Sequence, residues 1–388
     1  LLSTGIAQFQ QIAEVYISES LKRLRVLKSP KITMGITRNS GLLDITLQTE
    51  RLEPGELEGL LSSYRRRRKY YRLKNGDFLE LEDNGLSAVA ELAEGLELSV
   101  EELEEGHIRV PEYRSFYLDQ VLRENEGIVE VKRSSSYKAF LRSMKNVEDS
   151  DYEVPAGLNA ELRPYQKFGF RWLMTLGAMG FGGILADDMG LGKTLEVLTY
   201  LARQQQKLPK GRFLLVVPAS LLDNWSRELD RFTPSLSYTV LHGRTAKKLE
   251  EVLSDSQTFL TLTTYALVPR LAGLQKIPWD GVILDEAQAI KNPGTRQARQ
   301  IKELKARHRL AMTGTPVEND LSNLWSLFDF LDPGLLGSRK EFAAYAAGLK
   351  TSGNYEPLRA ALSPFILRRL KTDKSIISDL PEKIEKNE

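Results

Sequence analysis

The stretch ILADDMGLGKTLE, residues 184–196, constrains the fold of this chain more than any other. Its apolar beginning predicts a strand, and its end predicts the first turn of a helix, with two glycines in the loop between them. The loop ends as phosphate-binding loops of the type G-x-x-x-x-G-K-[ST] do, with Gly192, Lys193 and Thr194, but Asp187 stands where the first glycine belongs. A strand that leads through such a loop into a helix predicts an anion-binding site at the helix N-terminus.

Short apolar runs alternate with helical segments throughout residues 156–388. The runs that predict strands are Gly183–Ala186, Phe213–Val217, Thr258–Thr263, Gly281–Leu284 and Arg309–Met312. Segments between them predict helices, for example Thr194–Gln205 and Leu221–Phe232. Alternating strands and helices form a parallel sheet with helices on both faces, and such sheets bind ligands at the carboxyl ends of their strands. We therefore expect an α/β domain whose site lies where the glycine-containing loop follows its strand.

Residues 1–150 have a different pattern. Alternating apolar residues in KITMGITRNSGLLDITLQT predict strands, a helix is expected after Pro54, and Asn75-Gly76 between apolar runs predicts a hairpin. An acidic helical stretch follows, LSAVAELAEGLELSVEELEEG. The polar segment 146–166 contains Pro-Ala-Gly and marks a boundary. We expect a smaller α+β domain at residues 1–150, without a catalytic motif, ahead of the α/β domain at residues 156–388.

Charge is segregated within the smaller domain. Residues 64–74 carry seven basic and no acidic side chains, and residues 91–105 carry seven acidic and no basic ones. The favoured interpretation is two solvated faces. A basic patch with Tyr64, Tyr70 and Tyr71 is also typical of a contact with nucleic-acid phosphates. A third interpretation is that the two segments regulate each other or a neighbouring domain.

Composition excludes several other chemistries. The chain of 388 residues has no cysteine and only three histidines, so cysteine-based sites are excluded and a histidine metal site is disfavoured. The net charge of +2 gives no global attraction to nucleic acid. No apolar run approaches the roughly 18 residues that span a bilayer, and the start LLSTGIAQFQ does not resemble a signal peptide. Because residue 1 is Leu, we expect a trimmed fragment; no membrane partner is indicated, and the oligomeric state stays open.

A second motif favours a nucleotide at the anion site. WDGVILDEAQAIKN is an apolar strand that ends in Asp285 and Glu286. At the carboxyl end of a neighbouring strand, Asp285 would hold Mg²⁺ together with the Thr194 hydroxyl, and Glu286 would orient and deprotonate the attacking water. Lys193 would reach the β- and γ-phosphates. Two acids after a strand are also typical of a helix N-terminus, but their co-occurrence with the loop disfavours that interpretation.

Two weaker signals flank these motifs. Gln166, in LRPYQKFGFRW, precedes the loop, and a side-chain amide can pair with both a donor and an acceptor on adenine. The strand LAMTGTP, residues 310–316, ends in a polar turn that could sense the phosphate state beside the acids. Taken alone, the first is typical of a solvated glutamine and the second of an ordinary turn.

Together these segments resemble the first lobe of the superfamily-two helicase-like ATPases, and more narrowly the Swi/Snf family of DNA-translocating ATPases. The matching segments are Leu162–Gln166, Ala186–Thr194, Val217–Trp225, Thr263–Tyr265, Asp285–Asn292, Met312–Asn319, 324–338 and 365–373. Asp187 in place of the first glycine is itself typical of this family's motif I. The resemblance covers residues 156–383. It implies a RecA-like lobe that binds ATP and Mg²⁺.

The resemblance also assigns roles to residues. The nucleotide-binding residues are Gln166, Asp187, Asp188, Met189, Gly190, Leu191, Gly192, Lys193 and Thr194, and the catalytic ones are Lys193, Asp285 and Glu286. Contacts with one DNA strand would come from Pro218, Ala219, Ser220, Thr263 and Thr264, and Ser220 is also expected as a helix N-cap. Coupling between the two sites would use Gln288, Thr313, Gly314 and Thr315. Gln288 replaces the more familiar histidine, so its contact would be made by an amide.

The resemblance implies a function as well. The leading hypothesis is a DNA-dependent ATPase that translocates on double-stranded DNA and moves or strips bound proteins such as RNA polymerase. The alternatives are a strand-separating helicase and a nucleotide-gated scaffold associated with RNA polymerase. Residues 1–150 resemble the helicase-associated domain of bacterial members, which implies a cytoplasmic protein at the nucleoid. Because a second lobe would supply the arginines that stabilise transition-state charge, we expect this chain alone to bind ATP weakly and hydrolyse it poorly.

Overall fold

The structure is a computed structural model that describes residues 8, 11–14, 16, 25–28, 31–39, 42–50, 52–53, 55–81, 85–96, 98–145, 147–148, 150–243, 258–271, 273–314 and 321–373. The chain divides into two compact units. Residues 1–141 and 355–362 form the first, called here the accessory unit, and residues 142–354 and 363–388 form the second, called the α/β lobe. Each unit is described by itself.

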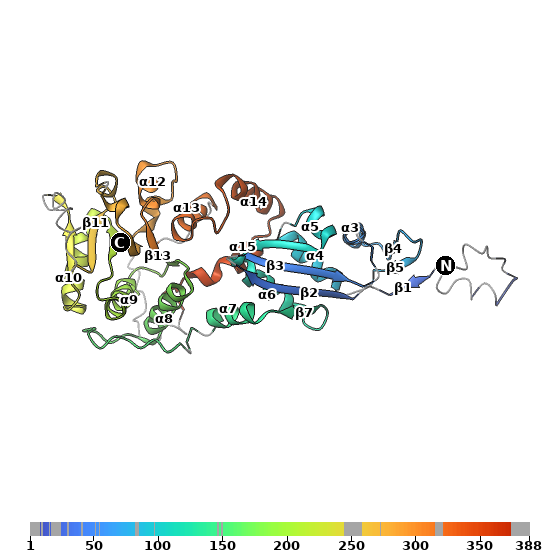
Figure 1. The fold of residues 1–388 in the computed structure, drawn as a ribbon, viewed down its shortest axis with the longest axis horizontal. Coiled ribbons are helices and arrows are strands. Elements are labelled where there is room, and N and C mark those ends of the chain that lie inside the picture. Colours follow the sequence, from blue (N-terminus) through green and yellow to red (C-terminus); the bar gives the residue numbers. More distant parts are fainter. Residues whose placement is uncertain are drawn as a thin grey trace, which may run out of the picture. The chain divides into compact units, whose positions relative to one another are not determined.

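A seven-stranded parallel sheet forms the centre of the α/β lobe (Figure 1). The strands are β8 (Gly183–Leu185), β9 (Phe213–Val217), β10 (Tyr238–Leu241), β11 (Leu260–Thr264), β12 (Trp279–Leu284), β13 (Ala306–Met312) and β14 (Ile366–Leu367). They lie side by side in the order β10-β11-β9-β12-β13-β8-β14. Every residue of β8, β9 and β11 is buried, as expected for a parallel sheet covered on both faces. Because all described pairs are parallel, the carboxyl ends of the strands meet at one edge.

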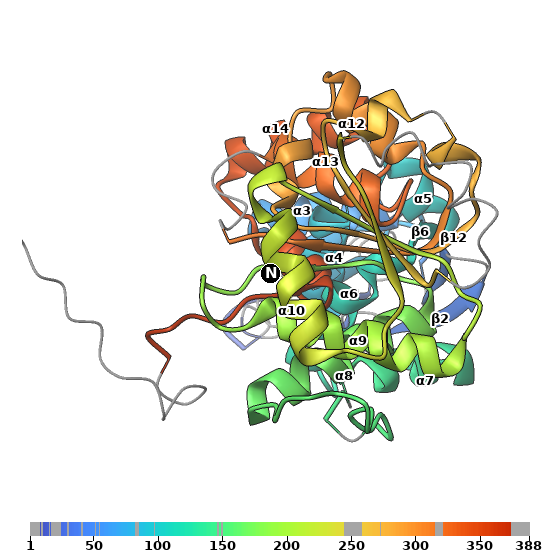
Figure 2. The same cartoon turned by 90° about the vertical axis from the view of Figure 1, so that its left-hand side faces the viewer.

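Helices cover both faces of this sheet. They are α8 (Pro164–Met179), α9 (Lys193–Lys207), α10 (Leu222–Phe232), α12 (Arg296–Lys302), α13 (Leu321–Leu331) and α14 (Arg339–Ser352). Short 3₁₀ turns connect them: η2 (Ala219–Leu221), η4 (Val268–Arg270), η5 (Leu274–Lys276), η6 (Ala287–Ile290) and η7 (Ser363–Phe365). The helices α8 and α9 lie side by side on one face, and α12 and α13 lie on the other (Figures 1 and 2). None of the helices that the structure describes, in either unit, is long and apolar enough to cross a membrane.

The accessory unit is built on two small sheets. The larger has the order β6-β3-β2-β7, from β2 (Ile32–Asn39), β3 (Leu42–Thr49), β6 (His107–Pro111) and β7 (Glu130–Arg133). The smaller has the order β1-β5-β4, from β1 (Val26–Leu27), β4 (Tyr70–Arg72) and β5 (Phe78–Glu80). Burial alternates along β2 and β3, so one face of their antiparallel hairpin carries the core residues and the other is partly exposed.

Helices from two distant parts of the sequence complete the accessory unit. They are α3 (Leu57–Arg65), α4 (Gly85–Gly95), α5 (Val100–Glu105), the 3₁₀ turn η1 (Glu112–Arg114), α6 (Ser115–Glu124), α7 (Ser135–Lys145), which leads into the α/β lobe, and α15 (Glu356–Leu362). The last of these packs against α6 and η1, although more than 200 residues separate them in sequence. The chain therefore enters the accessory unit twice.

The structure confirms the predicted fold class, a parallel sheet with helices on both faces beside a smaller α+β region. The Asn75-Gly76 hairpin is also confirmed, because β4 and β5 pair antiparallel around Gly76, whose φ is 96°. The acidic helical stretch is two helices, because Ser99 begins α5 with a capping box that includes Glu102. The prediction that Ser220 is an N-cap is wrong: it lies inside η2, and Leu221 precedes α10 without a side-chain cap. The strands β10 and β14 were not predicted.

Candidate nucleotide site

The loop between β8 and α9 has the backbone geometry of an anion-binding turn. Gly190 and Gly192 both have positive φ, 83° and 84°, and Gly192 precedes the first residue of α9. A Cβ on Gly192 would clash with the Gln166 side-chain amide. Glycine is therefore required here for its conformation and for the close approach of α8. Lys193 and Thr194 follow in the first turn of α9, where unpaired backbone N–H groups favour an anion.

Lys193 folds back over this loop. Its Nζ donates to the carbonyl oxygens of Asp187 at 2.6 Å and Asp188 at 3.4 Å. Burial lowers the pKa of Lys193, and the charges of Asp187, Glu286 and Asp285 oppose that shift. The lysine and the two predicted catalytic acids are thus close enough for their charges to interact, and their catalytic roles remain predictions.

The predicted adenine-binding residue, Gln166, contacts the loop itself. Its side chain is 6% exposed, its Oε1 accepts from the Arg163 backbone N–H at 3.0 Å, and its Nε2 donates to the Leu191 carbonyl at 3.2 Å. Tyr165 donates through its hydroxyl to the same Leu191 carbonyl at 2.9 Å. These bonds tie the start of α8 to the loop. Adenine recognition by Gln166 remains a prediction.

Asp187, which stands where the first glycine was expected, is fully buried in an ion-pair cluster. The Arg369 guanidinium donates to the Asp187 carboxylate, through Nε at 2.9 Å and also through Nη2. The same Nη2 donates to both Glu196 carboxylate oxygens, at 2.7 and 2.8 Å. Burial raises the pKa of Glu196 to about 8 against the opposing effect of Arg369. The Asp187 carboxylate therefore fixes the start of the loop to Arg369.

The first acid of the second motif, Asp285, follows β12 and is 7% exposed. Its Oδ2 accepts from the Trp225 indole N–H at 2.7 Å, and its Oδ1 accepts from the Glu286 backbone N–H at 2.9 Å. Its carbonyl oxygen accepts from the Tyr265 hydroxyl at 2.6 Å. Burial raises the pKa of Asp285, and the Trp225 hydrogen bond opposes that shift. The carboxylate is thus held in one orientation, and each of its oxygens keeps a free lone pair.

Glu286, Gln288 and Thr313 form a chain of side-chain hydrogen bonds. Gln288 donates through Nε2 to the Glu286 carboxylate at 2.6 Å, and its Oε1 accepts from the Thr313 hydroxyl at 3.0 Å. Glu286 has a φ of 49°, a left-handed conformation that is rare for a non-glycine residue and is often found at functional sites. The predicted amide contact of Gln288 is therefore present, and it links the second acid to the end of β13.

The acids lie one strand further from the loop than the sequence analysis assumed. Asp285 and Glu286 follow β12, whereas the loop follows β8, and β13 lies between these strands. The end of β13 fills the gap: the Thr313 backbone N–H donates to the Leu185 carbonyl at 3.1 Å, and a Cβ on Gly314 would contact Met189, an exposed loop residue. Thr315, the remaining predicted coupling residue, lies outside the described residues.

The predicted DNA-contact residues divide into exposed and buried ones. Ala219 and Ser220 are exposed and Pro218 is half-buried, just beyond the carboxyl end of β9. Thr263 and Thr264 are 0% and 2% exposed, and the Thr263 hydroxyl donates to the Leu241 carbonyl at 3.2 Å. Those two side chains are therefore buried within the sheet in this structure. DNA contact by residues 218–220 stays a prediction.

Sequence reasoning missed three residues of the site. Arg369, Trp225 and Tyr265 lay within segments matched to the family, but no role was assigned to any of them. Arg369 comes 182 positions after the aspartate that it binds. A tryptophan or tyrosine next to an apolar helix or strand predicts burial, and nothing local indicates that its polar atom bonds to a catalytic carboxylate. The signal that could have found Arg369 was the basic pair in FILRRLKTD, since an acid in a buried part of the loop needs a cationic partner.

The residues that would hold Mg²⁺ are Thr194 and Asp285. A hydroxyl and one carboxylate fit this ion, which binds few protein ligands and keeps several waters. No group of three or more His, Cys, Asp or Glu residues that could form a metal cage by itself occurs within the described part of the chain. The donor set therefore matches a metal that arrives with a phosphate ligand.

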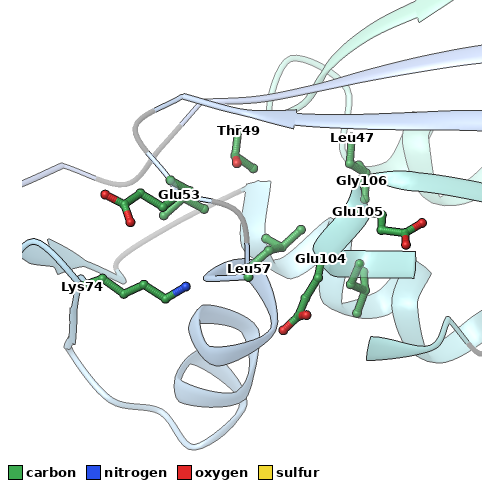
Figure 3. Close-up of a pocket in the computed structure, with 11 residues that line it drawn as sticks. Leu47, Thr49, Glu53, Leu57, Lys74, Glu104, Glu105 and Gly106 are labelled. Carbon is green, nitrogen blue, oxygen red and sulfur yellow. The ribbon is translucent and has the colours of Figure 1, made fainter. Parts of the chain in front are cut away.

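The accessory unit has a separate hollow, of about 690 Å³, between β3, α3 and α5 (Figure 3). Figure 3 shows Lys74 and Glu53 on one side of it and Glu104 and Glu105 on the other. A Cβ on Gly55 would lie 3.4 Å from the Lys74 Nζ and 3.8 Å from the Glu104 carboxylate. The ends of the basic and acidic segments are thus neighbours within one unit, and Arg65 to Lys69 are exposed.

A RecA-like lobe with a phosphate-binding loop, paired acids and a hydrogen-bonded link between two strand ends is typical of helicase-like, ATP-binding hydrolases. Residues 165–388 match the family model described as SNF2-related domain, and residues 1–155 match the one described as bacterial SNF2 helicase associated. The chain belongs to the SNF2 family.

Individual relatives agree with this assignment. A putative ATP-dependent helicase/translocase YwqA of Bacillus subtilis is 37% identical over 66% of this chain and 28% of its own length. The ISWI chromatin-remodeling complex ATPase ISW1 of Saccharomyces cerevisiae is 36% identical over 59% of this chain and 21% of its own length. The solved Sulfolobus solfataricus SWI2/SNF2 ATPase core in complex with dsDNA has a TM-score of 0.55 and 42% identity, over 59% of this chain and 49% of that one. The chain thus spans about a quarter of the length of these curated relatives.

Proposed function

We propose that this chain carries the ATP-binding and ATP-hydrolysing lobe of a DNA-dependent ATPase that translocates on duplex DNA. The observation that carries the proposal is the convergence of Lys193, Asp285 and Glu286 at one edge of the sheet, with Gln288 and Thr313 linking the last acid to a neighbouring strand. Simple nucleotide binding would not require the hydrogen-bonded acids, and hydrolysis does.

Each residue has a defined task in this proposal. The backbone N–H groups of residues 190–194 and the Lys193 ammonium bind the phosphates and balance their charge. Thr194 and Asp285 hold Mg²⁺, which supplies charge neutralisation when bound. Glu286 accepts a proton from the attacking water, and Gln288 keeps its carboxylate oriented. When the phosphate state changes, Gln288 moves, and its hydrogen bond to Thr313 passes this movement to the end of β13.

Duplex DNA is the proposed track. A solved SWI2/SNF2 ATPase core that is 42% identical to this chain is in complex with dsDNA. The exposed residues Ala219 and Ser220 lie at the same edge of the sheet as the phosphate loop, where a hydroxyl and backbone N–H groups can bind DNA phosphates without reading sequence. The work done on the track would be displacement of bound proteins, RNA polymerase among them, in the bacterial cytoplasm.

The test is the ATPase rate of the full-length protein with duplex DNA, single-stranded DNA and RNA in turn. The proposal expects strong stimulation by duplex DNA, and the 388-residue chain alone is expected to be slow. Displacement of a triplex-forming third strand without separation of the duplex would distinguish translocation from strand separation. A rate that no nucleic acid changes would contradict the proposal and favour a nucleotide-gated scaffold.

A further inference from the structure

The segment that contains Arg369 runs along the first part of the phosphate loop. The strand β14 pairs with β8 through Leu367, and the pairing continues beyond both strands. The bonds are Ala186 N–H to the Leu367 carbonyl at 2.7 Å, Asp188 N–H to the Arg369 carbonyl at 3.1 Å, Arg369 N–H to Asp187 Oδ1 at 2.9 Å and Lys371 N–H to Asp188 Oδ2 at 3.0 Å. Residues 367–371 therefore form a second wall of the loop.

Arg369 fixes the register of this wall. Its side chain is 4% exposed and donates to two buried carboxylates, Asp187 and Glu196. Its guanidinium also donates to the Tyr165 carbonyl and lies 5.0 Å from the centre of the Tyr165 ring. Space for Glu196 comes from Gly169 of α8, where any Cβ would contact that carboxylate. A slip of the segment would leave the buried Arg369 guanidinium and the Asp187 carboxylate without each other, which is strongly unfavourable.

Two residues beyond this anchor, Lys371 is brought over the loop. A Cβ on Gly190 would lie 3.0 Å from the Lys371 Nζ. The Lys371 side chain is exposed, and its ammonium has no carboxylate partner among residues that the structure describes. Lys193, by contrast, donates to carbonyls within the loop. The loop thus has a second cation, Lys371, whose ammonium lies close to the backbone of Gly190.

We propose that Lys371 is a second phosphate-binding lysine of the nucleotide site, and that Arg369 is its positioning residue. The inference rests on the proposed ATP site and adds a residue from a segment far beyond the loop motif. An ammonium next to the N–H groups of residues 190–192 adds charge-assisted hydrogen bonds to a polyphosphate that occupies them. This role explains why an aspartate stands at position 187: its carboxylate holds the segment 367–371, which carries Lys371.

The test is equilibrium binding of ATP with Mg²⁺ to the 388-residue chain and five variants, one of which combines Arg369→Lys with Lys371→Gln. We expect Lys371→Gln to raise the Kd for ATP about tenfold to a hundredfold, the value of one lost charge-assisted contact. Lys371→Arg keeps the charge and should stay within a few-fold of the parent. Lys210→Gln is the matched control, because Lys210 is an exposed lysine just before the amino end of β9. Thermal unfolding without nucleotide should be the same for all the lysine variants.

Arg369→Lys tests the positioning role, since it keeps a charge but loses the planar fork. We expect it to weaken ATP binding in the parent and to add no further loss to Lys371→Gln, so that the two changes are not additive. Equal ATP affinity of Lys371→Gln and the parent would overturn the inference and leave the ATP site intact. Equal loss in Lys371→Gln and Lys371→Arg, with a lower unfolding temperature, would also overturn it. A parent chain that binds no ATP would overturn the proposed function and the inference together.

Discussion

The two units bury charged residues for different purposes. In the accessory unit the buried acids support local structure: Glu56 accepts from the backbone N–H groups of Glu53 and Lys74, and Glu112 pairs with Arg38. In the α/β lobe the buried acids Asp187 and Asp285 lie at the carboxyl ends of strands and converge on one loop. Burial of a charge therefore identifies a site only where several strand ends bring such residues together.

The largest expected effect compares an acid of the candidate nucleotide site with a buried acid of the accessory unit. Glu286→Gln should lower the DNA-stimulated ATPase rate of the full-length protein about 10²- to 10⁴-fold, because a general base is lost while its size is kept. Glu112→Gln, in the accessory unit, should keep most of the rate, since it removes only a structural ion pair. Steady-state phosphate release measures both. If Glu286→Gln retained the parent rate, the assignment of the catalytic acid would be wrong.

The next effect concerns stability and compares a buried arginine with an exposed one. Arg369→Gln should lower the free energy of unfolding of the α/β lobe by about 3–5 kcal/mol, because it leaves buried carboxylates unpaired. Arg109→Gln in the accessory unit removes an ion pair with Asp44 whose arginine is 78% exposed, and should cost about 1 kcal/mol or less.

Urea unfolding measures the Arg369 effect cleanly, because all four tryptophans, Trp172, Trp225, Trp279 and Trp325, lie in the α/β lobe. Hydrogen exchange of the β6 amides reports on Arg109 in the accessory unit. A smaller loss in Arg369→Gln than in Arg109→Gln would show that the buried cluster does not hold the lobe together.

The third prediction is a pH dependence of the α/β lobe. His308 Nε2 donates to the Phe181 carbonyl at 2.9 Å, so its Nδ1 carries no proton and accepts from the Tyr200 hydroxyl at 2.7 Å. Burial lowers the pKa of His308 from 6.5 to about 4, against the opposing Phe181 hydrogen bond. Between these values the unfolded chain binds a proton that the folded lobe does not, so stability falls as pH falls.

The histidine contribution should reach about 3 kcal/mol by pH 4. It is measured as the difference in urea unfolding, by tryptophan fluorescence, between the parent and His308→Gln at pH 4.5 to 7.5. The parent should lose stability more steeply with acid than the variant. Parallel curves would mean that His308 binds protons equally in the folded and unfolded chain, so that burial does not lower its pKa.

The smallest effect compares two serines before helices. Ser99→Ala should lower the stability of the accessory unit by about 1 kcal/mol, because the Ser99 side chain accepts from the Glu102 backbone N–H. Ser220→Ala should leave the stability of the lobe nearly unchanged, since α10 begins without a side-chain cap. Hydrogen exchange of α5 and tryptophan-detected unfolding measure the two. If Ser220→Ala lowered stability as much as Ser99→Ala, Ser220 would be an N-cap after all.

The sequence by itself determined the class of fold, the phosphate loop and the two acids. These are local signals: Gly192-Lys193-Thr194 and Asp285-Glu286 each follow an apolar run, and a parallel sheet brings such ends to one edge whatever the strand order. The sequence also indicated that Gln288 would make its contact through an amide, but it left the partners of that amide open.

Only the tertiary structure decided the strand order and the partners of the buried charges. Nothing in the sequence says that β13 lies between β8 and β12, so that Thr313 fills the gap between loop and acids. Nor does any local pattern join Asp187 to Arg369 across 182 positions, since charge pairing in a folded core depends on which segments the sheet places side by side. The aspartate that replaces the first glycine has a meaning only there: it binds the strand that carries Lys371 over the loop.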